Sequence, residues 1–153
     1  MIIDSKLLWK DHISQKKNEL NNRFRQLFWL LGRQSKLSTQ NKLLIYKTII
    51  APIWKYGVEI WGTASTTNLK IIQRVQSKIL RTIVNAEWYI RDEDIHRDLN
   101  VKTVKEVVRD SSLKHTIRLV QHSNRELRQL PVKETLAPRR LKRYVPSELV
   151  NRY

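Results

Sequence analysis

Glycine and proline are scarce in this chain, and this scarcity constrains its fold more than any other feature. Its 153 residues include only three glycines and four prolines, whereas an all-β fold needs turn residues after each of its short strands. Long helices need few such residues. We therefore expect an all-α, multi-helix bundle, and a hydrophobic content of 41% is enough for one domain with its own core.

An apolar stripe predicts the first helix, from about Trp9 to Leu31. Its members recur at the spacing that places side chains on one face of an α-helix, and Gly32 is a natural stop. They are Trp9, Ile13, Leu20, Phe24, Leu27, Phe28 and Leu31. Trp29 lies off this stripe.

A second helix is predicted from an N-cap at Ser38 toward Trp61. Pro52 lies inside it and cannot donate a hydrogen bond to the carbonyl of Thr48, so this helix should be kinked. Because apolar residues are dense here, we expect Trp54 and Trp61 to be buried.

A third helix, from a cap at Thr67 to about Asn85, separates apolar from basic residues. One arc holds Leu69, Ile72, Val75, Gln76, Ile79, Leu80 and Ile83, and the opposite arc, here called the basic face, holds Lys70, Arg74, Lys78 and Arg81. Residues 68–86 contain no Asp or Glu, so the four cations lack acidic partners within the helix. The basic face therefore predicts phosphate binding, and the alternative is a solvated surface.

Two further helices follow. A short one is expected over residues 92–99, and a capping box at Thr103 and Glu106 predicts another toward His122. The apolar residues of this last helix fall on two sides. It should therefore either bend near Ser111 and Ser112 or be covered on two faces.

The composition changes beyond residue 130. We expect a helical domain over residues 1–130 and an extended basic tail over residues 131–153. A second candidate for phosphate binding lies in this tail: Arg139, Arg140, Lys142 and Arg143. The alternatives for this cluster are a flexible basic tail or a nuclear-import signal.

The charge balance points to a polyanionic partner. Lys and Arg number 30 and Asp and Glu 14, which gives a formal net charge of +16. Such a chain attracts phosphates and releases their counterions on contact, so RNA or DNA is the expected partner. The alternative is a ribosomal-protein-like or merely soluble basic surface. The absence of cysteine fits an intracellular protein, nuclear or cytoplasmic, and we expect no membrane segment.

No catalytic constellation is visible. The chain has no cysteine, no His-x-x-x-His pair and no glycine-rich phosphate loop, so we expect no catalytic residue, no metal site and no cofactor. Two aromatic residues in a predicted loop after the basic helix, Trp88 and Tyr89, are candidates for stacking on unpaired bases. The alternative is that they seal an edge of the core.

Several motifs resemble one family of mobile-element polymerases. They include Tyr46, Pro52, Trp54, Tyr56-Gly57 and Trp61-Gly62, followed by a Gln-x-x-x-Leu-Arg helix and an Ile-His-x-Asp-Leu box. Together they resemble the thumb and adjoining region, C-terminal to the polymerase active site, in jockey-clade non-LTR retrotransposon reverse transcriptases. One departure is Glu87, where the family usually has proline.

The resemblance implies a part of the polymerase that grips nucleic acid but performs no chemistry. The metal-binding aspartates of the family lie upstream in the palm, and no Asp-Asp pair occurs in this chain. The chain is thus expected to hold the RNA or DNA backbone without sequence preference and not to act as an enzyme alone. The alternatives are a helical protein-interaction module, with the apolar face that would pack on a palm domain, and an inert truncated relic.

Overall fold

The computed structural model describes residues 1–3, 8–129 and 146–151. This described part forms helices and loops and no β-strand, so the all-α prediction is confirmed. In chain order the elements are α1 (Lys10–Gln26), α2 (Phe28–Leu31), α3 (Thr39–Ile45), the π-helical turn η1 (Tyr46–Ile50), α4 (Ala51–Lys55), α5 (Val58–Trp61), α6 (Thr66–Val84), α7 (Asp92–Asp98), α8 (Val104–Val120), α9 (Arg125–Gln129) and the 3-10 helix η3 (Pro146–Asn151).

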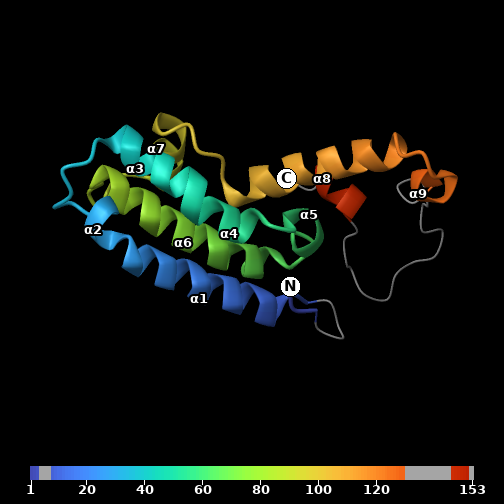
Figure 1. The fold of residues 1–153 in the computed structure, drawn as a ribbon, viewed down its shortest axis with the longest axis horizontal. Coiled ribbons are helices and arrows are strands. Elements are labelled where there is room, and N and C mark those ends of the chain that lie inside the picture. The colour runs from blue at the N-terminus through green and yellow to red at the C-terminus, as the bar shows by residue number, and fades with distance from the viewer. Residues whose placement is uncertain (4–7, 130–145, 152–153) are drawn as a thin grey trace.

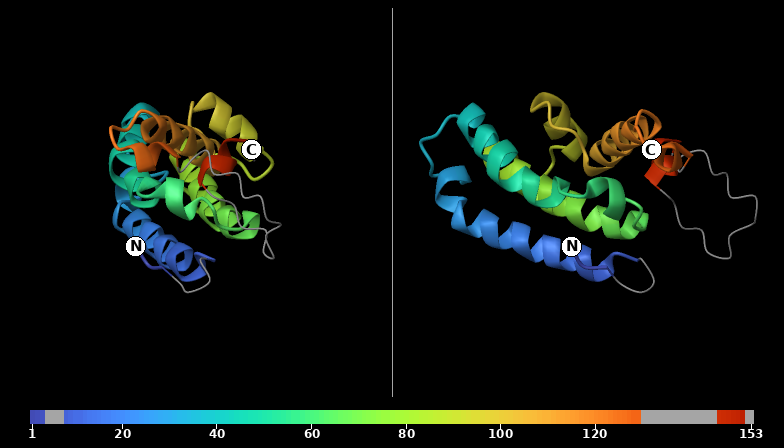
Figure 2. Two further views of the ribbon diagram at one scale, coloured as in Figure 1. Left: turned by 90° about the vertical axis from the view of Figure 1, so that its right-hand side faces the viewer. Right: turned by 45° about the vertical axis from the view of Figure 1, so that its right-hand side comes forward.

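Three helical segments form the bundle. α1 and α6 run side by side in the same direction, and the segment α3–η1–α4 packs against both (Figure 1). α7 and the start of α8 lie on the opposite side of α6 from α1, and the rest of α8 extends away from the bundle toward α9 (Figure 2). α6 is therefore the central helix, with a different neighbour on each side.

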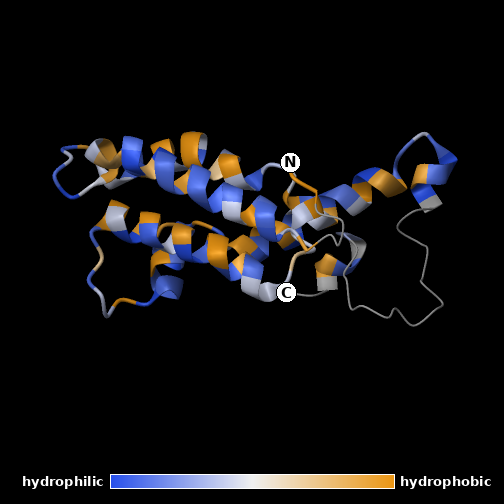
Figure 3. Cartoon of the chain, turned by 90° about the horizontal axis from the view of Figure 1, so that it is seen from below, coloured by the Kyte–Doolittle hydropathy of each residue, from blue (hydrophilic) through white to orange (hydrophobic). Residues whose placement is uncertain are grey.

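The core lies between these segments. Hydrophobic and hydrophilic bands alternate along the helices (Figure 3), as expected for helices that are buried on one side. Ile13 of α1, Ile50 of η1 and Ile72 of α6 are at most 1% exposed. All seven residues of the predicted apolar arc of α6 are buried.

The N-terminal cap of α6 lies earlier than predicted. Ser65, not Thr67, is the cap, and its hydroxyl accepts a hydrogen bond from the backbone N–H of Asn68 at 3.3 Å. Both residues have a suitable side chain, so local chemistry alone does not choose between them. The helix ends at Asn85, which adopts the left-handed conformation at φ 52°.

The first predicted helix is interrupted. α1 ends at Gln26, Leu27 leaves the helical conformation, and α2 adds one further turn before Gly32. Trp9 and Leu31 are buried as predicted, but Phe28 is 52% exposed. Phe28 lies at the edge of the stripe, where the short turn of α2 does not bury it.

The second predicted helix begins at its Ser38 cap, as expected, but ends earlier than Trp61. The proline disturbance takes the form of the π-helical turn η1, directly before α4. Gly57 then adopts a φ of 64°, which favours glycine and separates α4 from α5. Trp54 and Trp61 are buried, as predicted.

Burial also affects Tyr46 in η1. Desolvation raises the pKa of its hydroxyl to about 12, and the neighbouring side chains of Gln76 and Trp54 oppose this shift. The hydroxyl therefore stays neutral inside the core.

α8 is one continuous helix. The capping box of Thr103 and Glu106 is present as predicted, and the helix passes through Ser112 without a break. α5 and η3 both contact α8, but Leu113, Ile117 and Val120, on the second apolar side, are 44%, 45% and 51% exposed. The prediction that the helix is covered on two faces is therefore wrong. At the α5 contact, a Cβ on Gly62 would lie only 2.8 Å from Cγ1 of Val108, so glycine permits the close approach.

The structure describes six residues of the predicted tail, Pro146–Asn151. These residues form η3, which packs on α8, and Leu149 is fully buried. Burial of this leucine stabilises the contact of the segment with α8. The cluster Arg139, Arg140, Lys142 and Arg143 lies outside the described residues, and the domain boundary at residue 130 stays a prediction.

Candidate nucleic-acid interface

Three cations of the basic face have no bonded partner on α6 or elsewhere in the described residues. Lys70, Arg74 and Lys78 are four residues apart and exposed, so they form a row along the helix. Within the described residues, none of their side chains makes a hydrogen bond or an ion pair. Their like charges are therefore not compensated within the helix, and an external anion would relieve the repulsion.

Arg81, the fourth residue of the basic face, has internal partners. Its Nη2 lies 2.7 Å from Oδ1 of Asp92 at the start of α7, and its Nε donates to the same oxygen at 2.8 Å. It also donates to the backbone carbonyls of Glu87, at 3.1 Å, and Ile90. The acidic partner of Arg81, Asp92, thus lies outside α6. Arg81 also stabilises the loop between α6 and α7 through its hydrogen bonds to the loop carbonyls.

The two candidate stacking residues lie in that loop. Trp88 is 88% exposed and Tyr89 67% exposed, so neither seals an edge of the core. Their rings pack edge to face, with centroids 5.9 Å apart and planes at 85°. Because Arg81 holds the backbone on both sides of them, the pair is presented at the C-terminal end of the basic face.

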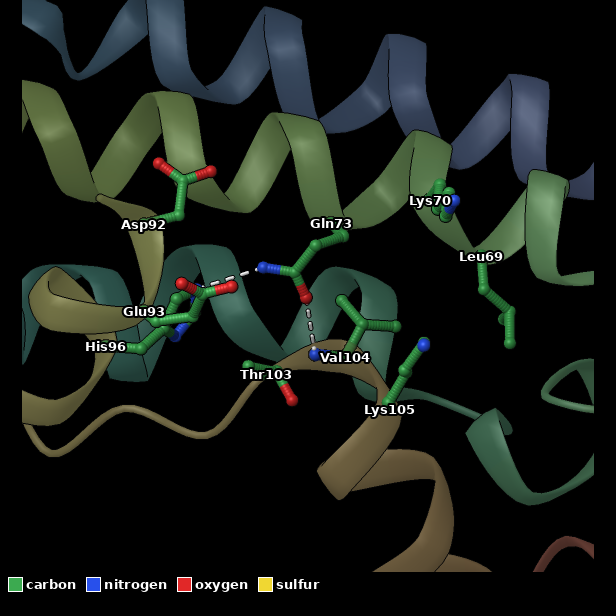
Figure 4. Close-up of a pocket in the computed structure, with 9 residues that line it drawn as sticks. All are labelled: Leu69, Lys70, Gln73, Asp92, Glu93, His96, Thr103, Val104 and Lys105. Atoms are coloured by element: carbon green, nitrogen blue, oxygen red, sulfur yellow. Dashed lines mark hydrogen bonds between the residues drawn. The ribbon is translucent and has the colours of Figure 1, made fainter. Parts of the chain in front are cut away.

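A hollow of about 240 Å³, here called the α7-side hollow, lies between α6, α7 and the start of α8. Figure 4 shows the nine residues that line it: Leu69, Lys70, Gln73, Asp92, Glu93, His96, Thr103, Val104 and Lys105. It combines two lysines with two carboxylates, so its field does not favour an anion.

Hydrogen bonds between helices cross this α7-side hollow (Figure 4). Gln73 of α6 donates from Nε2 to Nε2 of His96 at 2.9 Å and accepts at Oε1 from the N–H of Val104 at 2.8 Å. His96 Nδ1 donates to the carbonyl of Val101 at 2.7 Å. The network joins α6 to α7 and α8. Sequence reasoning missed it, because these partners are far apart in the chain.

A larger hollow of about 440 Å³, here called the α1-side hollow, lies on the opposite flank of α6. Asn21, Phe24, Arg25, Phe28, Lys78 and Thr82 line it. Lys78 therefore belongs both to the basic face and to the rim of this hollow. This site is not visible in the sequence, because its two halves are at least fifty residues apart.

The described residues show no group of three or more His, Cys, Asp or Glu side chains that could hold a metal ion. The acidic residues of α7 lie at its N-terminal turn, where they complement the helix dipole. Asp94 pairs with Arg97 at 2.7 Å. Across the described ranges, no helix combines the length and apolar character that crossing a membrane requires.

Comparisons with known proteins identify relatives among mobile elements. No protein-family model matches the chain, and no solved structure matches it. The chain is 39% identical over 152 residues to a probable RNA-directed DNA polymerase from transposon X-element of Drosophila melanogaster. It is 36% identical over 159 residues to the RNA-directed DNA polymerase from mobile element jockey of Drosophila funebris.

Both matches cover 99% of this chain but only 16% and 17% of the two relatives. A third match, to a probable RNA-directed DNA polymerase from transposon BS of Drosophila melanogaster, covers 92% of the chain and 15% of the relative at 36% identity. Over nearly its whole length, the chain is therefore a homologue of one part of the jockey and X-element RNA-directed DNA polymerases.

Proposed function

We propose that this chain is the part of a mobile-element reverse transcriptase that grips the RNA or DNA backbone, through the basic face of α6. The observation that carries the proposal is the row of three exposed cations, Lys70, Arg74 and Lys78, for which the described structure supplies no partner. A surplus of sixteen positive charges over the chain adds a long-range attraction for nucleic acid.

Binding by such a row is independent of sequence. Its cations meet phosphates, which are the same at every nucleotide, so they carry no information about the bases. Binding should weaken steeply with salt, because each phosphate contact releases condensed counterions. The cluster at residues 139–143 is the second candidate grip, and Trp88 and Tyr89 are candidate stacking residues beside the first.

The proposed role is binding without catalysis. The relatives are named as polymerases, but nucleotide transfer in such enzymes uses paired carboxylates that hold metal ions. The described residues contain no group of three or more His, Cys, Asp or Glu side chains that could hold a metal ion. The isolated chain should therefore bind nucleic acid and not extend a primer, and the chemistry would come from a palm domain elsewhere in the polymerase.

A second candidate function, docking on another protein segment, is favoured by one observation. Leu44, Ile49 and Tyr56, along the segment α3–η1–α4, are all exposed, although the Trp9 stripe is largely buried. Exposed apolar residues often mark a contact surface where they form one contiguous patch. In this alternative, the segment packs against the palm or another part of the polymerase that lies outside this chain.

The test is binding of the purified chain to labelled duplex and single-stranded RNA and DNA over a salt series. A triple variant, Lys70→Gln, Arg74→Gln and Lys78→Gln, is compared with a control triple on α8, Arg109→Gln, Lys114→Gln and Arg118→Gln. The control removes the same charge from three exposed sites on another helix. Arg81 is left unchanged, because its internal partners give it a structural role.

The α6 triple should bind more weakly and its slope of log affinity against log salt should be flatter by about 2 to 3, at roughly 0.7–0.9 per lost phosphate contact. The α8 triple should keep nearly the original slope. Equal losses in the two variants would show that net charge alone drives binding. Absence of binding by the unmodified chain near physiological salt would favour the docking function instead.

A further inference from the structure

We propose that the α1-side hollow binds one unpaired nucleotide, with its base against Phe28 and its phosphate between Arg25 and Lys78. This inference rests on the proposed nucleic-acid function, because Lys78 belongs to the basic face. It adds a stacking residue that the sequence pattern did not indicate, Phe28, and a preference for unpaired strands.

The size and position of the hollow suit a nucleotide. Its volume of about 440 Å³ falls within the range of roughly 300–1,000 Å³ that is usual for small-molecule sites, whereas the α7-side hollow, at about 240 Å³, falls below it. The hollow opens beside the row of cations on α6. A strand that follows this row could therefore place one base in it without leaving the basic face.

Phe28 supplies an aromatic surface that is already oriented. It is half exposed, yet Phe24 packs edge to face against it, with centroids 5.8 Å apart and planes at 85°. On another side, the absence of a side chain on Gly32 makes room for the ring, since a Cβ there would lie 3.3 Å from Cε1 of Phe28. A braced ring loses little conformational entropy when a base stacks on it.

The charge around the hollow favours a phosphate. Arg25 of α1 and Lys78 of α6 are both exposed, and within the described residues neither side chain has a hydrogen bond or an ion pair. None of the described residues that line the hollow is acidic. A guanidinium can bind a phosphate through two parallel hydrogen bonds, and a lysine adds a point charge.

Two neutral polar residues complete the lining. The hydroxyl of Thr82 donates to the carbonyl of Lys78 at 3.0 Å, so its oxygen can still accept. The amide of Asn21 offers both a donor and an acceptor. These groups could contact the sugar or an edge of the base, but Phe28 itself stacks on any base. The site should therefore be tolerant of sequence.

Base pairing should oppose this binding. A base inside a duplex is stacked on both faces, and taking it out has a cost of a few kcal/mol. Phe28 should hence contribute to binding of single strands and of single-stranded overhangs. It should contribute little to binding of blunt duplex, which the cations of α6 hold by its phosphates.

The test combines affinity with cross-linking. Affinities for single-stranded and blunt duplex RNA are measured for the unmodified chain, for Phe28→Leu, for Phe28→Tyr and for a matched control, Trp29→Leu. Trp29 is the neighbouring residue, is 72% exposed and does not line the hollow. In parallel, a single strand that carries 5-iodouridine is irradiated with the chain, and the cross-linked tryptic peptides are identified by mass spectrometry.

We expect Phe28→Leu to weaken single-strand binding about tenfold, as loss of one stacked base does, and to leave duplex binding unchanged. Phe28→Tyr and Trp29→Leu should bind like the unmodified chain. The cross-link should fall in the peptide of residues 26–33, which contains Phe28, and should be lost in Phe28→Leu. Thermal unfolding of each variant shows whether the fold is kept.

The failure of this inference is separable from that of the proposed function. If Phe28→Leu and Trp29→Leu behave alike and no cross-link forms at residues 26–33, the nucleotide site is wrong even when the α6 triple still weakens binding. If the α6 triple binds normally while Phe28→Leu loses affinity and the cross-link, the basic face and the phosphate contact of Lys78 are wrong, and only the stacking of a base on Phe28 stands. Absence of any binding overturns both.

Discussion

The two flanks of α6 use polar side chains in opposite ways. On the flank that faces α7 and α8, Gln73 and His96 bond to each other and to the backbone, and Arg81 is paired with Asp92. On the flank that faces α1, Lys78 and Arg25 have no such bonds within the described structure. Gln73, His96 and Arg81 thus join helices on the first flank, where Lys70 alone of the basic face lines the α7-side hollow without a partner in the described structure. On the second flank, Lys78 and Arg25 remain available to a ligand.

This difference shows why charge alone is a poor guide to a binding site. Arg81 and Lys78 belong to the same basic face and look equivalent in the sequence. In the structure, Arg81 holds the loop that carries Trp88, whereas Lys78 stands beside a hollow. Variants on the two flanks should therefore separate stability from binding.

The largest effect on stability is expected from Gln73→Leu. It leaves the N–H of Val104 and Nε2 of His96 without their partner, and an unsatisfied buried polar group costs about 1–3 kcal/mol. We expect the free energy of unfolding to fall by about 2 kcal/mol, measured by chemical denaturation. Affinity for nucleic acid, measured where the variant is still folded, should change little. A loss of affinity without a loss of stability would reverse the assignment of the two flanks.

The next effect on stability is expected from a second buried histidine, His12 of α1. His12 accepts from the N–H of Ile2 at 3.3 Å, but its Nε2 has no hydrogen-bond partner within the described residues. Burial and then the positive charge of Lys16 lower the pKa of His12 below its ordinary value of 6.5. The folded state therefore binds this proton less readily than the unfolded state does.

Stability should consequently be lost as the pH falls through 6.5, the ordinary value, with a contribution of at most about 1.4 kcal/mol per pH unit from His12. The loss should stop below the pKa of the folded state. His12→Asn keeps an acceptor for Ile2 and removes the titration. Unfolding free energies of both proteins, measured from pH 7.5 to 5.5, isolate the effect as a difference. Parallel pH profiles would contradict the lowered pKa.

A smaller effect is expected from Arg81→Gln. This substitution removes the ion pair with Asp92 and the hydrogen bonds to the loop carbonyls. Because Asp92 is partly exposed, we expect the free energy of unfolding to fall by only about 1 kcal/mol. The amides of residues 85–91 should exchange with deuterium faster, as measured by mass spectrometry. Unchanged exchange there would show that Arg81 does not hold the loop.

The smallest change in stability is expected from Lys78→Gln. This side chain is exposed and has no bonded partner in the described part of the chain, so the free energy of unfolding should stay within about 0.5 kcal/mol of the original. Affinity for single-stranded RNA should nevertheless fall. A variant that loses stability but keeps affinity would place Lys78 among the structural residues.

Local patterns predicted the parts of the fold that local chemistry decides. The apolar arc of α6, the Ser38 cap and the capping box at Thr103 depend on residues three or four positions apart, and such spacings are visible in a sequence. The break at Leu27 and the π-helical turn before α4 are not visible in this way, because packing against other helices determines where a helix is interrupted.

The candidate site was only half predictable for the same reason. The basic face is a property of one helix, so its cations were found. The hollow that Lys78 borders also needs Phe28 and Arg25 from a distant segment, and Phe28 was assigned to the core stripe from its spacing alone. Likewise, His96 and Gln73 meet only when α7 folds back on α6.

The most direct test of this account is to map amide chemical shifts of the labelled chain as a short RNA duplex with a single-stranded overhang is added. The account predicts the largest shifts along the exposed row of α6 and at Asn21, Arg25 and Thr82 around the α1-side hollow, with small shifts at His96 and Val101. Shifts concentrated on the α7 flank, with none around Lys78, would contradict it.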